Sequence, residues 1–409
     1  MMRSIRNGLS ACLLGVILSM ALAGGASAAP AKGSPLVIGT ICSCSGPLGS
    51  GQAGIKPMSS AWVKWTNAHG GVNGHPVKLV FKDDKGDATA AAAAARALVS
   101  QKVLAIVGNF SFQESAWAKI AKDAGIPVVG TPGLSPDEYT NAGFFPIGAN
   151  ATSNLYQGLT STKKAGAAKL AIMYCTEVPT CGQLKAVMGA FLKTIGGGVS
   201  VVSSSNVTAS QPSFAAQCLA SKNSGANGTF IIDQSIVTTR IMRECVQQGW
   251  TPTLFGANGS VPHNDPAAFA KSKVVLTLPT LGIDDRSTAG GKLFHQVLAK
   301  YAPNLSSSAN YSENLGSVFS GLQLFAKAAS TAKLKPASTT SQLKNGLYAL
   351  KNETLGGLTG PLTFKRGQPT FNGCAFYSSY TGTKWVADTK PYCMTPARVQ
   401  LLLKNLGGG

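Results

Sequence analysis

The chain has 409 residues, of which 44% are hydrophobic, and a formal net charge of +20. This length exceeds one ordinary hydrophobic core and predicts two domains. Its Lys and Arg residues are scattered, with no dense run and no interleaved aromatic residues. This pattern argues against nucleic-acid binding and favours an evenly basic surface.

The first 28 residues have the pattern of a secretory signal peptide. Arg3 and Arg6 form a basic start, residues 13–22 are apolar, and residues 26–28 read Ala-Ser-Ala, a typical cleavage site. The apolar run is too short to favour a membrane span. Cys12 ends a lipoprotein-like Leu-Ser-Ala-Cys box, but this box precedes the apolar run instead of following it. We therefore expect an exported chain without membrane insertion, in the periplasm or at the outer face of the cytoplasmic membrane. Lipidation at Cys12 is the lesser alternative.

Eight cysteines remain after the signal peptide, and an even number in an exported chain predicts disulfides. The expected pairs are Cys218 with Cys245 on helices flanking one strand, Cys374 with Cys393 around the final strands, and Cys175 with Cys181 around a short loop. Cys42 and Cys44 are left over, and their connectivity stays open because a Cys-x-Cys ring would be strained. Zinc is the competing interpretation, but no CxxC pair occurs and the four histidines are dispersed.

Extended apolar segments alternate with helical ones along the chain. The first series predicts strands at 36–39, 77–81, 103–107 and 126–129 and helices at 55–69, 88–99 and 113–124. After residue 150 the series restarts, with strands at 169–174, 199–203, 229–232 and 252–255 and helices at 183–194, 214–221 and 238–248. Helices follow at 291–301, 312–329 and 341–350, and late antiparallel strands at 361–364, 374–379 and 384–387. This order predicts an α/β fold with two doubly wound parallel-sheet lobes.

The most specific pattern is the stretch Asn-Ala-His-Gly-Gly-Val-Asn-Gly-His-Pro-Val-Lys-Leu-Val-Phe-Lys-Asp-Asp-Lys-Gly-Asp at 67–87. A helix ends at His69, a glycine-rich turn follows where positive φ is cheap, a strand begins after Pro76, and an acidic loop spans 83–87. This arrangement resembles the type I periplasmic solute-binding proteins of ABC importers, in the leucine/isoleucine/valine-binding branch. Their first helix runs into a "GGINGR" turn, a strand and a "DDQGDP" loop. The resemblance covers nearly all of the chain after the signal peptide.

The resemblance implies two lobes joined by a three-crossing hinge. Lobe one would comprise 34–149 and 279–355, lobe two 150–278 and 356–398, and residues 399–409 a C-terminal tail. The implied function is capture of a small polar or carboxylate-bearing molecule, an amino acid or a related acid or amide, and its delivery to the permease subunits of an ABC importer. The implied protein is a monomer with a small-molecule ligand, no cofactor, no metal and no nucleic-acid partner.

Candidate ligand contacts lie in loops after strands, because ligands bind outside the carboxyl ends of parallel strands. The residues that the resemblance implies for lobe one are Ser50, Ser111, Phe112, Gln113, Gly133 and Ser135. Ser50 replaces a family aromatic residue that packs on the ligand. Ser111, with backbone N–H groups at the following helix start, would hold a carboxylate. We therefore expect Ser111→Ala to affect binding more than stability, unless Ser111 is only an N-cap.

In lobe two the implied contacts are Cys181, Gln234 and Asn258. Cys181 and Gln234 stand where the family has tyrosines, and Asn258 stands where it has the acid that binds an ammonium. A buried ammonium without a carboxylate costs several kcal/mol. The substitution therefore predicts a ligand without an α-amino group, unless Asp233 or Glu177 supplies the acid.

The sequence lacks several common catalytic motifs: it has no G-x-S-x-G, no H-E-x-x-H and no P-loop. Asp83, Asp84 and Asp87 fit a surface loop better than a catalytic pair or a calcium site. We therefore expect a binding protein with no catalytic residues. The alternatives are a ligand sensor of the same fold without transport, an exported enzyme, and an adhesion protein without a ligand cleft.

Overall fold

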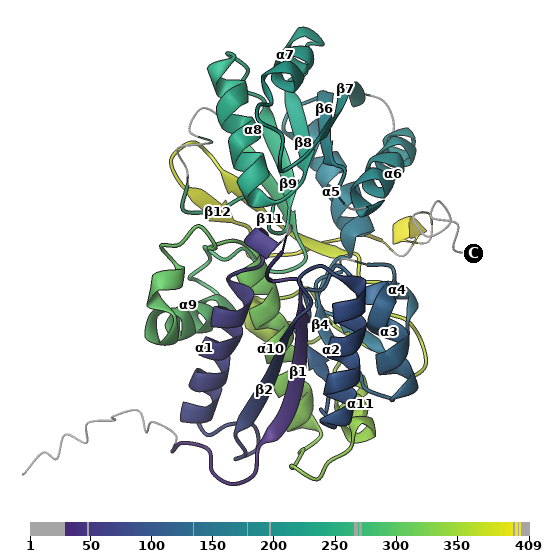
Figure 1. Ribbon diagram of the computed structural model, residues 1–409, viewed down its shortest axis with the longest axis vertical. Coiled ribbons are helices and arrows are strands. Elements are labelled where there is room, and N and C mark those ends of the chain that lie inside the picture. The colour runs from purple at the N-terminus through teal and green to yellow at the C-terminus, as the bar shows by residue number, and fades with distance from the viewer. Residues whose placement is uncertain are drawn as a thin grey trace, which may run out of the picture.

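The structure, a computed structural model, describes residues 29–46, 49–133, 135–177, 179–195, 198–265, 269, 272–395, 397–399 and 401. The predicted signal peptide, Cys12 and most of the expected C-terminal tail lie outside these residues. The described chain folds into two α/β lobes, one above the other in Figure 1. In these residues no helix has the length and apolar character needed to cross a membrane.

The first lobe is built on a parallel sheet of five strands in the order β2-β1-β3-β4-β5. The strands are β1 (Leu36–Cys42), β2 (Val77–Asp83), β3 (Ile106–Val107), β4 (Val128–Thr131) and β5 (Phe144–Pro146). β1 pairs with β2 in register along its whole length. Because these strands are parallel, their carboxyl ends lie along one edge of the sheet, toward the second lobe (Figure 1).

Helices cover both faces of the first sheet. Core contacts place α2 (Ala88–Ser100) and α3 (Glu114–Asp123) on one face, and α1 (Ile55–Ala68) and α10 (Asn314–Thr331) on the other. Neighbouring Val128 and Val129 belong to different core clusters, as the two-residue period of a strand requires. The other elements of this lobe are η1 (Gly49–Gly51), α4 (Asp137–Thr140), α9 (Ala289–Tyr301), η3 (Pro303–Leu305), α11 (Thr340–Ala349) and η4 (Leu355–Gly357).

The second lobe has a mixed sheet in the order β12-β11-β10-β9-β8-β6-β7, with β13 paired to β11. Its strands are β6 (Lys169–Cys175), β7 (Ser200–Val207), β8 (Gly228–Ile232), β9 (Thr253–Ala257), β10 (Val274–Leu278), β11 (Cys374–Tyr380), β12 (Trp385–Ala387) and β13 (Tyr392–Cys393). The pairs from β10 to β7 are parallel, whereas β11 is antiparallel to its neighbours. Core contacts place α5 (Ala151–Lys164) and α6 (Pro179–Ile195) on one face, and α7 (Ala215–Asn223) and α8 (Ser235–Gln247) on the other.

Three segments carry the chain between the lobes: 147–150, 279–288 and 358–373. They lie close together at the hinge. A Cβ added to Gly148 would lie 1.8 Å from the carbonyl oxygen of Pro279, so only glycine permits this approach. The N–H of Ala149 also donates to the carbonyl oxygen of Cys374 at 3.0 Å. The lobe boundaries expected from the resemblance stay a prediction.

The turn in the most specific sequence pattern has the expected conformation. α1 ends at Ala68, and His69 is its C-cap. Gly70, Gly71 and Gly74 follow with φ of 89°, 68° and 83°. Strand β2 begins at Val77, directly after Pro76.

Two predicted strands differ from the structure. The segment 361–364 is not a strand: it contributes one isolated bridge, between Leu362 and Glu353, because it belongs to a crossing segment and not to a sheet. β3 has only two residues, although the buried apolar run starts at Val103. An apolar run indicates that a segment is buried. A segment can be buried without forming the hydrogen bonds of a strand.

The eight cysteines form four disulfides, which confirms the expected pairing. The bridges are Cys42–Cys44, Cys175–Cys181, Cys218–Cys245 and Cys374–Cys393. The open connectivity of Cys42 and Cys44 is thereby resolved: these two residues pair with each other. Their Cα atoms are 5.1 Å apart, within the usual range for a disulfide.

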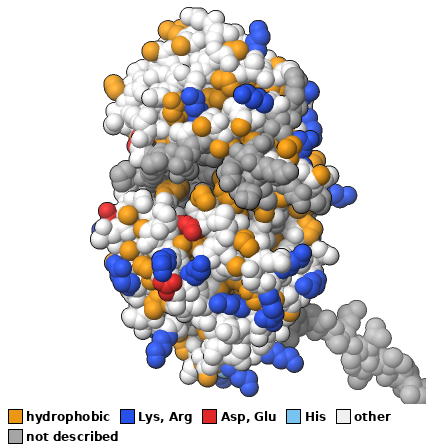
Figure 2. Space-filling view, turned by 90° about the vertical axis from the view of Figure 1, so that its right-hand side faces the viewer, with side chains coloured by type: hydrophobic (Ala, Val, Ile, Leu, Met, Phe, Trp, Pro, Cys, Tyr) orange, Lys and Arg blue, Asp and Glu red, His pale blue; other side chains and the backbone are white. Residues whose placement is uncertain are grey.

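The surface shown in Figure 2 carries Lys and Arg side chains over both lobes, with few acidic side chains among them. No dense basic stripe is visible on this face. This face therefore agrees with the evenly basic exterior expected from the composition.

Candidate functional site

The candidate site lies where the strand-end loops of the two lobes meet. Gly51 of η1, after β1, packs against the side chain of Gln234, the N-cap of α8 after β8. A Cβ on Gly51 would lie 2.2 Å from Oε1 of Gln234, so the lobes touch directly here. The carboxyl edges of two parallel sheets thus face each other, which is where α/β folds bind ligands.

Asp84 organises the lobe-one side of the site. Its carboxylate is fully buried and accepts from the hydroxyl of Ser43 at 2.7 Å and from that of Ser111. Ser111 in turn accepts from the N–H of Gln113 at 3.1 Å and from Nε1 of Trp117 at 3.2 Å. The sequence suggested that Asp84 belongs to a surface loop. Its burial shows that this prediction was wrong for Asp84. Ser111 does bind an anion at the start of α3, but this anion is the protein's own side chain.

Two buried glutamic acids bond the other two expected lobe-one residues, Ser135 through its hydroxyl and Gly133 through its backbone N–H. Ser135 donates its hydroxyl to Glu114, and Asn109 donates its side-chain amide to the same carboxyl. Glu138 accepts the N–H of Gly133. Burial raises the pKa of Glu114 well above its usual range, and repulsion from Glu138 raises it further. The hydrogen bonds from Ser135 and Asn109 lower this pKa but do not offset the rise. The groups expected to hold a ligand carboxylate are thus already bonded to internal acids.

The remaining lobe-one candidates lie at the edge of this network. Ser50 is exposed in η1. Phe112 is half-buried, and its N–H donates to Ser43 at 3.0 Å. Gln113 donates its side-chain amide to the carbonyl oxygen of Gly86 at 2.8 Å. A ligand role for these three residues stays a prediction.

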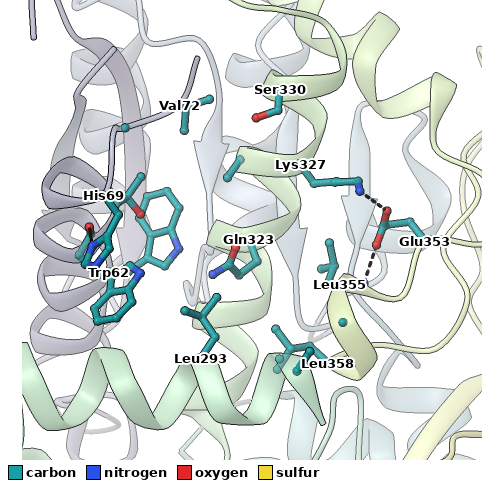
Figure 3. Close-up of a pocket in the computed structure, with 17 residues that line it drawn as sticks. Trp62, His69, Val72, Leu293, Gln323, Lys327, Ser330, Glu353, Leu355 and Leu358 are labelled. Atoms are coloured by element: carbon teal, nitrogen blue, oxygen red, sulfur yellow. Dashed lines mark hydrogen bonds and ion pairs between the residues drawn. The ribbon is translucent and has the colours of Figure 1, made fainter. Parts of the chain in front are cut away.

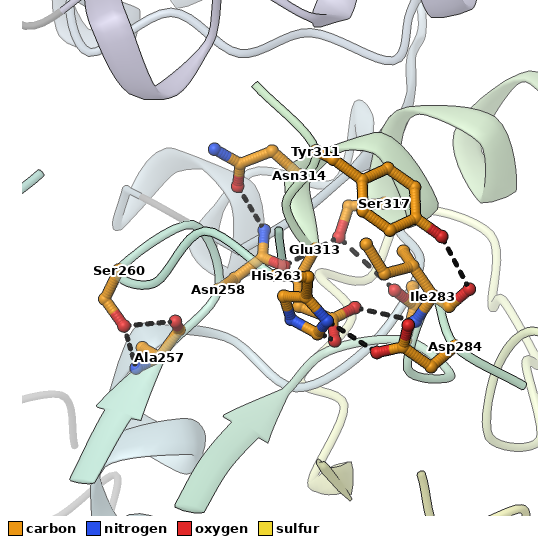
Figure 4. Close-up of polar contacts among 11 residues, drawn as sticks. Ala257, Asn258, Ser260, His263, Ile283, Asp284, Tyr311, Glu313, Asn314 and Ser317 are labelled. Carbon is orange, nitrogen blue, oxygen red and sulfur yellow. Dashed lines mark hydrogen bonds and ion pairs between the residues drawn. The ribbon is translucent and has the colours of Figure 1, made fainter. Parts of the chain in front are cut away.

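Asn258 joins the two lobes (Figure 4). It follows β9 of lobe two, and its amide donates to Oδ1 of Asn314 on α10 at 2.8 Å. Ser317, one turn further along α10, donates to Oδ1 of Asn258 at 3.3 Å. Asn314 also donates to the carbonyl oxygen of Gly51 at 2.8 Å. The residue at the expected ammonium site thus has both polar ends of its side chain bonded to lobe one.

Asp233 is the lobe-two acid with a free oxygen. It follows β8, and its Oδ1 accepts the N–H of Gln234 at 2.6 Å. Its Oδ2 is buried and has no hydrogen-bond partner among the described residues. Burial raises the pKa of Asp233 to about 7, and repulsion from Glu177 contributes to the rise. The hydrogen bond from Gln234 acts in the opposite direction. Glu177 itself is exposed and accepts the backbone N–H groups of Thr176 and Ala209. At neutral pH Asp233 can therefore accept or donate a hydrogen bond.

Cys181, the third lobe-two candidate, is buried at the start of α6. Its sulfur is bonded to Cys175, so it offers no thiol hydrogen. The resemblance implies a ligand role for this position, and that role stays a prediction.

A buried charged cluster lies beside the Asn258 contacts (Figure 4). Nδ1 of His263 is 2.5 Å from Oδ2 of Asp284, and Nε2 of His263 is 3.2 Å from Oε1 of Glu313. The imidazole stacks on Trp385 with ring centroids 3.9 Å apart. Burial alone would lower the pKa of His263, but the charges and hydrogen bonds of Glu313 and Asp284 outweigh it and raise the pKa to about 9.

The cluster of His263, Asp284 and Glu313 also contains metal-ligand types within 4.8 Å of one another. However, the two acids lie at opposite nitrogens of the imidazole ring, Asp284 at Nδ1 and Glu313 at Nε2. This geometry fits a cation between two carboxylates better than a metal centre.

A match to the periplasmic binding protein family runs from residue 35 to residue 383. The chain belongs to this family. The resemblance read from residues 67–87 is therefore confirmed, and with it the two-lobed type I fold. Members of this family are binding proteins rather than enzymes.

Solved structures of periplasmic binding proteins share this architecture. A substrate-binding periplasmic protein from Ralstonia solanacearum is 16% identical, with a TM-score of 0.72 over 86% of this chain and 99% of that chain. A fatty acid ABC transporter substrate-binding protein from Thermomonospora curvata is 14% identical, with a TM-score of 0.72 over 91% and 96%. The branched-chain amino acid transporter substrate binding protein LivJ from Streptococcus pneumoniae, in complex with isoleucine, is 20% identical, with a TM-score of 0.69 over 88% and 100%. At these identities the likeness shows the fold alone.

A curated relative, an amino acid binding protein of Pseudomonas aeruginosa, is 28% identical over 233 residues. The alignment covers 55% of this chain and 61% of that relative, which is less than two thirds of its length.

The acids that organise the site were not predicted as site residues. Asp84, Glu114 and Glu138 are all buried, and each bonds a group expected to hold the ligand or its neighbour. A sequence signal existed for one of them: Glu114 opens a helix directly after a strand-end loop. Nothing in the local pattern indicates that its partner is Ser135, because that pairing depends on the approach of β4 to β3.

Proposed function

We propose that the chain is an exported receptor that captures a small polar or carboxylate-bearing molecule between its lobes and delivers it to the permease subunits of an ABC importer. The proposed ligands are an amino acid or a related acid or amide. Membership of the periplasmic binding protein family supports this role. The facing carboxyl edges of the two sheets supply a place for the ligand, and the three crossing segments supply a hinge. No catalytic step, cofactor or metal is part of the proposal.

The unpartnered oxygen of Asp233 carries the proposal on ligand class. A buried carboxyl oxygen without a partner costs free energy, which a bound donor would recover. When the lobes part, Asp233 at the end of β8 becomes open to a ligand. An N–H group of that ligand fits Oδ2 in the closed state. Asp233, rather than Glu177, is thus the acid that compensates for Asn258.

The lobe-one contacts refine the ligand further. Ser111, Gly133 and Ser135 already donate to internal carboxyl groups, so a free ligand carboxylate would compete with three buried acids. A ligand with an amine or amide group is therefore favoured over a ligand with a carboxylate alone. The Asn258 substitution alone predicted a ligand without an α-amino group. Because Asp233 replaces the missing acid, an amino acid with its α-amino group is also a proposed ligand.

The experiment starts by identifying what co-purifies with the protein, by mass spectrometry of the denatured supernatant. Calorimetry against leucine, leucinamide, isovaleramide and isovalerate then separates the amine, amide and acid contributions. Solution scattering measures closure as a smaller radius of gyration with ligand. A ligand at a hundred times its Kd should also raise the free energy of unfolding by about 2.7 kcal/mol.

Asp233→Asn and Glu177→Gln form the matched pair of variants. We expect Asp233→Asn to weaken binding of the amine or amide ligand by about tenfold or more, and Glu177→Gln to leave it within about twofold. Tight binding of isovalerate alone, unchanged in Asp233→Asn, would contradict the role of Asp233 and the preference for an amine or amide group. Binding of a true ligand without compaction would contradict the hinge mechanism.

A further inference from the structure

Lobe one contains a groove of about 450 Å³ away from the candidate site. It lies between the second halves of α1 and α10, the start of α9, and the loop that contains η4 (Figure 3). The halves of α1 and α10 that face lobe two, near Gly51 and Asn314, are not part of it. The groove is thus separate from the inter-lobe site, and its volume lies in the usual range for small-molecule sites.

The walls of the groove are mainly apolar and aromatic. Trp62 of α1 lies on one side, and Leu293, Leu355 and Leu358 close the other. Trp65, one turn further along α1, also lines the groove. Trp65, Leu293 and Leu355 are only half-buried, so the fold leaves apolar surface open to water in a concave place. A concave site lined mainly by hydrophobic and aromatic side chains is the usual form of a small-molecule site.

One wall is held rigidly before any ligand arrives. The indole of Trp65 stacks on His69 with centroids 3.9 Å apart, and the edge of Tyr301 packs against it at 6.3 Å. Nδ1 of His69 lies 2.7 Å from the carbonyl oxygen of Trp65, which fixes the stacked ring. A preformed aromatic wall lowers the entropic cost of binding a flat molecule.

The opposite wall is also fixed. Lys327 forms an ion pair with Glu353 at 3.1 Å, and Glu353 accepts the N–H of Leu355 at 2.8 Å. These bonds hold Leu355 at a φ of 52°, a left-handed conformation that a leucine rarely adopts. The ion pair is charge-balanced, so this wall attracts neither an anion nor a cation strongly.

Gln323 supplies one polar group of the groove. It projects from α10 at the centre of the lining residues, between Trp62 and Leu358 (Figure 3). Its side-chain amide makes no hydrogen bond within the part of the chain that the structure describes, and it is half-buried. A primary amide offers both N–H donors and a carbonyl acceptor. Its natural complement is another amide.

We propose that this groove is a second binding site, for a small uncharged molecule that combines an aromatic ring or short apolar chain with an amide group. The apolar part packs between Trp65 and Leu293, and the amide pairs with Gln323. The concave apolar walls and the amide of Gln323 favour a small molecule as the occupant. This site is independent of the ligand delivered between the lobes.

The test uses acetanilide, which has a ring and a secondary amide, with toluene and N-methylacetamide as probes of each part alone. Binding is followed by the indole N–H signals in NMR spectra, and the signals of Trp62 and Trp65 are assigned by single substitutions to Phe. We expect acetanilide to move these two signals and to bind about tenfold more tightly than either partial probe. Equal binding of acetanilide and toluene, or no shift at Trp62 and Trp65, would overturn the proposal.

Three variants locate the site. Gln323→Leu should weaken acetanilide about tenfold and leave toluene unchanged. Ala326→Phe fills the groove from a half-buried position and should remove binding of both, whereas Ala93→Phe on the exposed side of α2 is the matched control and should not. Urea unfolding checks that each variant is folded. Asp233→Asn should leave acetanilide binding unchanged. Loss of acetanilide binding in Asp233→Asn would place the probe elsewhere and refute the site. Acetanilide binding that persists in Ala326→Phe would refute it in the same way.

Discussion

The side-chain amide of Asn258 donates a hydrogen bond to Oδ1 of Asn314, with 2.8 Å between the nitrogen and the oxygen. Asn258 follows a strand of lobe two, and Asn314 opens the long helix α10 of lobe one. The residue that the resemblance implies for a ligand contact here forms a direct bond between the lobes. In this chain, part of the closed state is therefore held by protein groups alone.

Removing this bond should favour the open form. We expect Asn258→Ala and Asn314→Ala each to increase the radius of gyration in the absence of added ligand, measured by solution scattering. In a double-mutant cycle on ligand affinity, the two amides should couple by about 0.5–1.5 kcal/mol. Asn304→Ala, an exposed asparagine in η3, is the control. Additive effects of the two substitutions would show that the amides act independently.

The cluster around His263 predicts a pH dependence of stability. The pKa of His263 is raised from the usual 6.5 to about 9 by Glu313 and Asp284, in spite of burial. Because the folded pKa is higher than the unfolded one, the stabilisation is fully present below pH 6.5 and is lost as the pH rises through 9. Its size is about 3 kcal/mol. Burial also raises the pKa of Glu313 against the attraction of His263, so part of the gain is offset by the cost of burying the second acid.

Urea unfolding at pH 6, 8 and 9.5 measures this dependence in the wild type and in His263→Gln. The wild type should lose more free energy of unfolding over this range than the variant does. Arg286 and the hydroxyl of Tyr311 also lie near these acids, but the pKa of Tyr311 is raised by burial and it stays protonated in this window. Parallel pH profiles for the two proteins would mean that His263 is not protonated in the folded state.

Ser111→Ala should lower stability more than ligand affinity. The substitution leaves Oδ2 of the buried Asp84 without this hydroxyl donor, which costs about 1.5–3 kcal/mol of unfolding free energy. Ser115→Ala, on the exposed side of the same helix α3, should change stability by less than about 0.5 kcal/mol. The sequence alone predicted the reverse order for Ser111, with binding affected most. Weakened binding with unchanged thermal unfolding would restore that interpretation.

The disulfides should contribute according to the length of chain they close. Cys218–Cys245 spans 27 positions and Cys42–Cys44 spans two. Replacing the first pair by alanine should lower the free energy of unfolding by about 3–4 kcal/mol, and replacing the second by about 1–2 kcal/mol. Equilibrium unfolding in urea compares the two double variants. Equal losses would show that chain entropy does not set their contribution.

Local sequence patterns predicted much of the architecture. The turn at Gly70, Gly71 and Gly74 was readable because positive φ is a property of single glycines. The alternation of apolar strands and amphipathic helices gave two α/β lobes, because burial follows the period of each element. The disulfide count followed from the even number of cysteines, and three of the four pairs followed from their positions on predicted elements.

The pairing of polar side chains was decided only by the tertiary structure. Ser111 bonds Asp84, 27 positions earlier, and Asn258 bonds Asn314, 56 positions later. A hydrogen bond requires its two atoms to lie within about 3 Å, which depends on how whole elements pack and not on the residue types at the two positions. The sequence by itself therefore determined the family, the two lobes and the loops that face each other. The packing of α3, α8 and α10 against those loops decided that Ser111 and Asn258 bind protein groups and left an oxygen of Asp233 without a partner.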